Sequence, residues 1–276
     1  MNKIIVAICE GGHDIAFISR VLLAHGFNNY DKKIKDFFAP FDKKFFNAMA
    51  SAKVDEKKLG YQPPPSEVPS MALSTENSLV FLHSMGGDTF REERINLINS
   101  YKNVKGQDGF SQYEFDFRFI YFLDADEIGV TGRLQQINEE LQLENGIANN
   151  GDLIVHQGNE FGAYVFHDAA NNMGTLENIV TNLLRVNGDR EYIAANEFIE
   201  NNMLDTERQK EIRYREGAQV YYGQPKFYKS KSTMSIMGQL QFSGSSNIVF
   251  IKNTDFIKLE NIHACPHCTM ITRLFS

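Results

Sequence analysis

The stretch Ile4-Ile-Val-Ala-Ile-Cys-Glu-Gly-Gly-His-Asp14 decides the fold of this chain of 276 residues. Its apolar run, Lys3 to Cys9, is continuous rather than alternating, which is typical of a strand covered on both faces in a parallel sheet. Asp14 can cap the helix predicted for Asp14 to His25, where apolar residues recur at helical spacing. A strand that stops at an acid, two glycines and a helix together form a βα unit.

Three later parts of the chain repeat this order of strand and helix. Four strand–helix pairs predict an α/β fold, with a Rossmann-like parallel sheet, right-handed crossovers and helices on both faces. The further predicted strands are Leu79–His83, Phe117–Leu123 and Ala163–Phe166, and the helices that follow are Arg91–Tyr101, Thr131–Leu143 and a helix that opens at Gly174 and runs to Leu184.

Two segments depart from this pattern. Residues 28–70 are rich in Lys, Asp and Phe and end in a proline-rich run, so they are interpreted as an insertion or lid, with a packed connector as the alternative. Its front half, Ile34 to Met49, is predicted as an amphipathic helix. Residues 1–185 then form the α/β domain, and residues 186–276 form a mainly helical extension packed on it. In the extension, helices are predicted for Glu191–Arg215 and Lys226–Leu240, and Asn247–Lys252 is expected to be a strand or an extended segment.

The composition limits the class of protein. The net charge of -7 and a pI near 5.6 argue against a protein that coats long duplex DNA, although a local basic groove stays open. Three cysteines do not form a disulfide framework, and the longest apolar runs fall far short of the roughly 20 residues of a membrane helix. We therefore expect a cytoplasmic protein that does not bind membranes.

Acids and glycines follow the predicted strands, where ligands bind in an open parallel sheet. Asp124 and Asp126 are two residues apart, so on extended backbone they project to the same side and repel each other unless a cation lies between them. Mg²⁺ suits such carboxylates, and Glu10 would be a further ligand or the general acid or base. The glycines that let backbone approach a phosphate are Gly11, Gly12, Gly86 and Gly87.

The motif Glu10-Gly-Gly-His-Asp14 with Asp124-Ala-Asp126 resembles the Toprim domain, and Gly86-Gly87 resembles its OLD-type nuclease version. The stretch from Tyr164 to Glu177 is similar to an uncharacterised bacterial family of stand-alone Toprim-like proteins. The resemblance implies phosphodiester chemistry on nucleic acid, dependent on Mg²⁺ or Mn²⁺. Asp124 and Asp126 would hold the metal and Glu10 would do acid/base work. Asp14 and Glu177 are the further candidate catalytic residues.

The chain departs from the OLD-type pattern at Asp88, where that pattern often has a lysine. A cation near the scissile phosphate is then missing from its usual place. The residues that could substitute for it are Lys229, Lys231 and Arg133.

Several alternatives stay open. The chain could be a non-catalytic Toprim-like module that binds a metal and a nucleotide or nucleic-acid ends, or it could have a degenerate site and a protein partner; the oligomeric state, a homodimer included, is not predicted. Cys265 and Cys268 could be half of a zinc site, a redox motif or part of a packed turn. Tyrosines and basic residues between Arg208 and Lys231 could stack bases and hold phosphates, or form a solvated helix.

Overall fold

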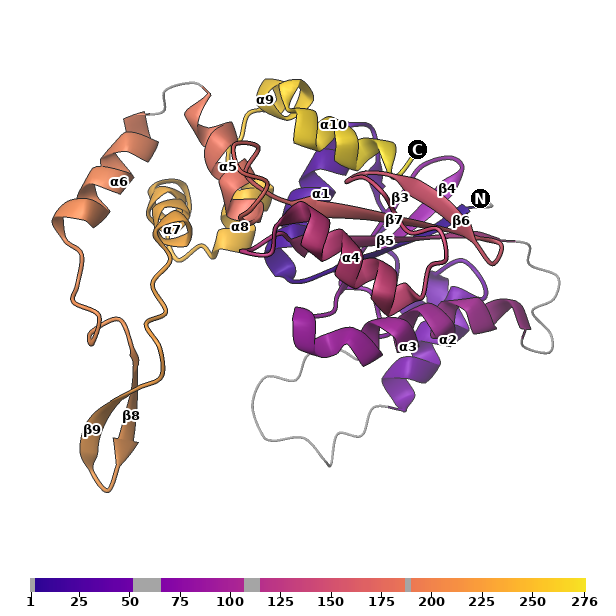
Figure 1. Cartoon of the computed structure of the whole chain (residues 1–276), viewed down its shortest axis with the longest axis horizontal. Coiled ribbons are helices and arrows are strands. Elements are labelled where there is room, and N and C mark those ends of the chain that lie inside the picture. Colours follow the sequence, from indigo (N-terminus) through magenta and orange to yellow (C-terminus); the bar gives the residue numbers. More distant parts are fainter. Residues whose placement is uncertain (1–2, 52–65, 107–114, 187–189) are drawn as a thin grey trace.

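A seven-stranded sheet lies at the centre of the computed structural model, which describes residues 3–51, 66–106, 115–186 and 190–276 (Figure 1). The strand order is β2-β3-β4-β1-β5-β7-β6, and the four strands β4, β1, β5 and β7 are parallel. The predicted α/β class with a parallel central sheet is confirmed. The parallel strands are β1 (Lys3–Cys9), β4 (Ser78–Ser84), β5 (Asp116–Asp124) and β7 (Asn159–Phe166).

Short antiparallel strands that the sequence did not predict close both edges of the sheet. On one side β3 (Met71–Ser74) pairs with β4 and with β2 (Asn28–Asn29), and on the other β6 (Leu153–His156) pairs with β7. These edge strands are two to four residues long, which is too short for a clear alternation of apolar and polar residues.

Helices cover both faces of the sheet, as the continuous apolar strands require. Alternate residues of β1 enter two separate hydrophobic clusters, Ile5 and Ala7 on one face and Ile4 and Val6 on the other. The first face is covered by α1 (Gly12–Ala24), α5 (Leu176–Arg185), α8 (Asn247–Asn253) and α10 (Pro266–Arg273), and the second by α2 (Phe41–Ala50), α3 (Arg91–Lys102) and α4 (Gly129–Leu141).

The described part of segment 28–70 is packed into the second cluster. Phe41 and Phe45 are fully buried in α2 and contact Phe81 of β4 edge to face. The helix predicted for Ile34–Met49 is split, because a short 3-10 turn (Ile34–Asp36) ends well before α2 begins. Residues 52–65, which include the start of the proline run, lie outside the described residues.

The C-terminal extension contains a hairpin where a helix was predicted. Helix α6 (Arg190–Asn201) ends early, and β8 (Glu211–Arg215) pairs with β9 (Ala218–Tyr222), so the prediction of helix through Arg215 was wrong. β-branched and aromatic residues occur in both strands, and the two turn residues, Glu216 and Gly217, have positive φ, as a tight hairpin turn requires.

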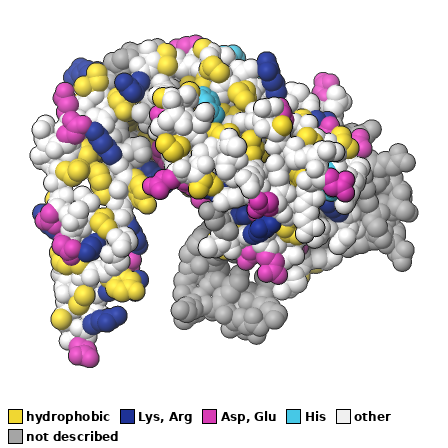
Figure 2. Space-filling model, viewed as in Figure 1, with side chains coloured by type: hydrophobic (Ala, Val, Ile, Leu, Met, Phe, Trp, Pro, Cys, Tyr) yellow, Lys and Arg dark blue, Asp and Glu magenta, His cyan; other side chains and the backbone are white. Residues whose placement is uncertain are grey.

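This hairpin arm (β8 and β9) stands away from the sheet across an open hollow (Figure 2). All ten of its residues are exposed. After it, α7 (Lys229–Gln241) and α9 (Leu259–Ala264) return the chain to the body, and the segment Asn247–Lys252, expected to be extended, lies in helix α8.

Candidate acidic site at the carboxyl ends of β1 and β5

The site lies where the sheet changes its direction of winding. The chain passes from β1 to β4 on one side of β1, and then crosses to β5 on the other side. In open α/β sheets this point leaves a crevice beyond the carboxyl ends of the two diverging strands. Glu10 directly follows β1, and Asp124 is the last residue of β5. The sheet therefore brings these two acids, separated by more than a hundred residues, to one edge.

Glu10 is placed by the glycine pair after β4. Gly86 donates its N–H to the carbonyl of Glu10 at 3.0 Å, which holds the two strand ends together. At Gly87 a Cβ atom would lie 2.9 Å from Oε1 of Glu10, closer than such contacts occur. The lack of a side chain at Gly87 therefore makes room for the Glu10 carboxylate.

The glycines that open α1 have two different surroundings. Nothing lies within 4 Å of a Cβ built on Gly11, so open space remains beside it. A Cβ on Gly12 would lie 2.8 Å from Ile248, so this glycine allows α8 to pack closely against α1.

Asp14 is a buried acid on the first turn of α1. Its Oδ2 accepts a hydrogen bond from the N–H of Gly11 at 2.8 Å, so it caps the helix from inside. Burial, together with the nearby charges of Glu10 and Glu177, raises the pKa of Asp14 from 3.8 to about 7. This carboxyl can therefore exchange a proton near neutral pH.

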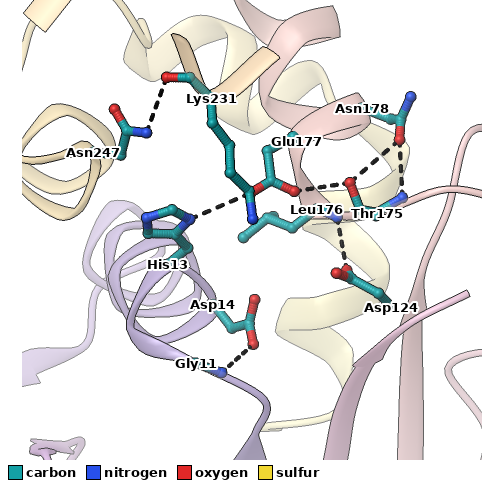
Figure 3. A network of polar contacts seen from close by, with 10 residues as sticks. All are labelled: Gly11, His13, Asp14, Asp124, Thr175, Leu176, Glu177, Asn178, Lys231 and Asn247. Atoms are coloured by element: carbon teal, nitrogen blue, oxygen red, sulfur yellow. Dashed lines mark hydrogen bonds and ion pairs between the residues drawn. The ribbon is translucent and has the colours of Figure 1, made fainter. Parts of the chain in front are cut away.

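Asp124 shares this environment. Its Oδ1 accepts a hydrogen bond from the N–H of Leu176, the first residue of α5, at 2.8 Å. Burial, together with the charges of Asp14, Glu10 and Glu177, raises the pKa of Asp124 from 3.8 to about 8. Glu10, Asp14 and Glu177 therefore lie near enough to Asp124 to act on its charge. Figure 3 shows Asp14, Asp124 and Glu177 of this group.

Two nitrogen-bearing side chains, His13 and Lys231, lie close to Glu177. Its Oε1 lies 3.3 Å from Nδ1 of His13 and 3.3 Å from Nζ of Lys231, and its Oε2 accepts a hydrogen bond from Thr175 at 2.8 Å (Figure 3). Although burial opposes ionisation, these contacts lower the pKa of Glu177 to about 2. Glu177 is therefore a stable anion that holds Lys231 and His13 at the edge.

Asp126 does not continue the extended backbone of β5. The prediction of parallel carboxylates assumed extended backbone, but Asp126 has φ of +47° and exchanges two backbone hydrogen bonds with Gly174. Its Oδ2 pairs with Nη2 of Arg133 at 2.9 Å, while Nε of Arg133 donates to the carbonyl of Asp124 at 2.8 Å. Arg133 thus ties the turn together, and Asp126 has a cation of its own.

Two of the three basic residues proposed to replace the missing lysine already pair with an acid. Arg133 binds the turn of Asp126, and Lys229 forms an ion pair with Glu200. Lys231 contacts Glu177 within the site, and its carbonyl accepts a hydrogen bond from Asn247 at 3.0 Å. The side chain of Asp88 lies outside the description of the structure.

The carboxylate oxygens of this site fit a hard divalent cation such as Mg²⁺. Carboxylate oxygens are the ligands of Mg²⁺. Burial and, after it, mutual repulsion raise the pKa values of Asp14 and Asp124, and a bound cation would relieve the repulsion. Within the described ranges, however, no three His, Cys, Asp or Glu side chains are grouped tightly enough to hold a metal by themselves. The site therefore fits Mg²⁺ held by one or two carboxylates, with water or phosphate completing its shell.

Comparisons with known proteins inform the fold. No family model matches the chain, and no curated protein matches it. Among solved structures, the crystal structure of the hypothetical protein PH0156 from Pyrococcus horikoshii OT3 is similar over 100% of both chains, with a TM-score of 0.58 and 15% sequence identity. At this identity the likeness concerns the α/β fold alone. Separately, the described helices include none with the length and apolar character needed to cross a bilayer.

Proposed function

We propose that this chain is a Toprim-like cytoplasmic protein that catalyses Mg²⁺- or Mn²⁺-dependent phosphodiester cleavage in nucleic acid. One observation carries the proposal. The carboxylates of Glu10, Asp14, Asp124 and Glu177 interact electrostatically at the carboxyl ends of β1 and β5, and two of them have pKa values raised to about 7 and about 8. Keeping buried acids together costs stability, and such a cost is typical of a functional site.

Each of these side chains has a distinct role in the proposal. Glu10 and Asp124 hold the cation, which would neutralise developing charge on the phosphate and activate water. Asp14, with its pKa near neutrality, takes or gives the proton. Lys231, held by Glu177, binds a phosphate oxygen and replaces the lysine that the OLD-type pattern has after its glycines. Asp126, predicted as a third metal ligand, would join only after releasing Arg133.

The hairpin arm supports a nucleic-acid substrate. The segment from Arg208 to Lys231 contains seven basic residues and two acidic ones, although the whole chain has a net charge of -7. The guanidinium of Arg213 lies 3.9 Å from the ring centroid of Tyr222, and Tyr214 and Tyr221 are exposed on the same hairpin. Exposed aromatic rings and basic groups can stack bases and contact phosphates without sequence preference.

A cleavage assay tests the proposal. Wild-type protein, Glu10→Gln and Asp124→Asn are incubated with labelled single- and double-stranded DNA and RNA in Mg²⁺, in Mn²⁺ and in chelator. Metal-dependent cleavage that both variants lose is the expected result. Glu144→Gln is the matched control, because Glu144 is an exposed acid beyond the far end of α4.

Binding measurements on the same variants separate cleavage from its alternative. Wild-type protein that binds metal and nucleic-acid ends but leaves every substrate intact would identify a non-catalytic module. Failure to bind Mg²⁺ or Mn²⁺ in calorimetry would contradict both and would favour a scaffold for a protein partner.

A further inference from the structure

We propose a second site on this protein: Cys265 and Cys268 form a redox-active dithiol that exchanges with low-molecular-weight disulfides of the glutathione class. The pair lies on the C-terminal extension, and neither cysteine contributes to the acidic site. The inference is therefore independent of the function proposed above.

The two sulfurs are placed at the start of α10. Cys265 is the residue before the helix and Cys268 lies in its first turn, with Pro266 and His267 between them. Residues three apart on a helix have Cβ atoms ~5–6 Å apart, and the Cβ atoms of a disulfide lie about 3.5–4.5 Å apart. The Cys268 thiol already donates a hydrogen bond to the sulfur of Cys265. A disulfide between them therefore requires the two Cβ atoms to approach by roughly 1–2 Å.

The two cysteines have opposite environments. The sulfur of Cys265 accepts hydrogen bonds from the Cys268 thiol and from the N–H groups of Cys268 and His267, which lower the pKa of Cys265 to about 6 although burial opposes this. Cys268 is fully buried, and the bond that it donates together with burial raises its pKa. Cys265 is thus the attacking thiolate and Cys268 the resolving thiol, which is the division of labour of Cys-x-x-Cys pairs.

A cavity gives the attacking sulfur access to a small molecule. Cys265 lines a cavity of about 530 Å³ between α5 and α10, together with Leu183, Val186, Met270 and His167. Its volume is in the range of small-molecule sites. His267 is fixed at its rim, because its Nδ1 lies 2.6 Å from the hydroxyl of Tyr164. The remaining cysteine, Cys9, is buried in β1 with a raised pKa, so it is an inert thiol in the same chain.

The exchange is a balanced two-step reaction. The Cys265 thiolate attacks one sulfur of the disulfide RSSR; the S–S bond breaks, and the leaving RS⁻ takes a proton from water. Cys268 then loses its proton to water, and its sulfur attacks Sγ of Cys265. The second RS⁻ leaves and is protonated. The dithiol is oxidised by two electrons, and RSSR is reduced to two RSH. In a reducing compartment the dithiol is the resting form.

Thiol trapping of the full chain tests this. Folded protein is equilibrated at neutral pH in mixtures of reduced and oxidised glutathione, quenched in acid, unfolded and alkylated, and its mass is measured. We expect three alkylated cysteines in reduced glutathione and one, Cys9, in oxidised glutathione. Cys268→Ser should retain one glutathione on Cys265, and Cys265→Ser should retain none, because Cys268 is buried.

Three alkylated cysteines at every glutathione ratio would overturn the proposal, as would a disulfide that links two chains on a non-reducing gel. If Cys268→Ser does not fold, peptide mapping of the wild type decides. A linked peptide containing both Cys265 and Cys268 supports the proposal, and its absence contradicts it.

Discussion

Replacing Asp124 by Asn should remove most of the pH dependence of stability of the metal-free protein near neutral pH. In the unfolded chain the carboxyl ionises near its usual pKa of 3.8, whereas in the folded protein it stays protonated up to about pH 8. Because folding takes up this proton, the free energy of unfolding falls as the pH rises from the unfolded pKa to the folded one. The loss is about 1.4 kcal/mol per pH unit, so from roughly pH 6 to pH 8 it amounts to about 2–3 kcal/mol.

The neighbouring acids Asp14 and Glu177 also affect how stability depends on pH. Asp14, with its pKa raised to about 7, adds a loss of the same sign that is complete about one pH unit earlier. Glu177 has a lowered pKa of about 2, so its contribution to stability is fully present above its unfolded pKa of 4.5 and is lost only as the pH falls toward 2. Glu177 is therefore silent between pH 6 and pH 8.

Urea unfolding in the presence of chelator, at a series of pH values, measures the effect. The wild type and the exposed-site control Glu144→Gln should lose stability across this window, and Asp124→Asn should lose markedly less. Parallel curves for the wild type and Asp124→Asn would refute the reasoning, since they would mean that Asp124 ionises normally. Adding Mg²⁺ should restore stability most at high pH, because a cation must displace the proton before it binds the carboxylate.

Substitutions at three further residues test separate contacts. Lys231→Ala should weaken phosphate binding and nucleic-acid cleavage with little change in unfolding midpoint, because the Lys231–Glu177 pair is half exposed on the lysine side; Lys231→Arg should retain part of the binding in the same titration. Gly87→Ala should displace the Glu10 carboxylate and weaken Mg²⁺ binding in calorimetry while the circular dichroism spectrum is unchanged. Glu140→Ala removes the carboxylate that accepts two hydrogen bonds from the buried Arg94 guanidinium, at 2.9 and 2.6 Å. It should lower the free energy of unfolding, measured in urea, by about 3–5 kcal/mol.

The sequence was sufficient for the central sheet because its strands are long and apolar on both faces. The runs around Ile4–Cys9 and Phe117–Leu123 can be buried only in a parallel sheet, and their order along the chain places Glu10 and Asp124 at one edge. The short edge strands and the hairpin arm were missed. Both strands of the arm are exposed along their whole length, so their sequence shows no contrast between a buried face and a solvent face.

The site was predicted less completely than the fold. The spacing of Asp124 and Asp126 indicated two carboxylates on one side, but the positive φ of Asp126 is set by its hydrogen bonds to Gly174, a contact across almost fifty residues that spacing does not encode. Lys231 was one of three basic residues considered. Its contact with Glu177, between α7 and the first turn of α5, is what brings it to the site. Packing between two helices leaves no pattern in the local sequence that would predict such a contact.

The covering of α1 by residues near position 250 and beyond has a consequence for biosynthesis. Arg20, on the outer side of α1, donates to the carbonyls of Ile251 and Ile257, and the buried Arg118 of β5 donates to those of Leu274 and Ser276. The strand and helix that carry the acids of the site are therefore completed by segments made more than a hundred residues later. On the ribosome, the nascent chain holds its acidic edge unfinished until translation has passed these segments, so a product truncated before them exposes apolar surface and is a substrate for chaperones and proteases.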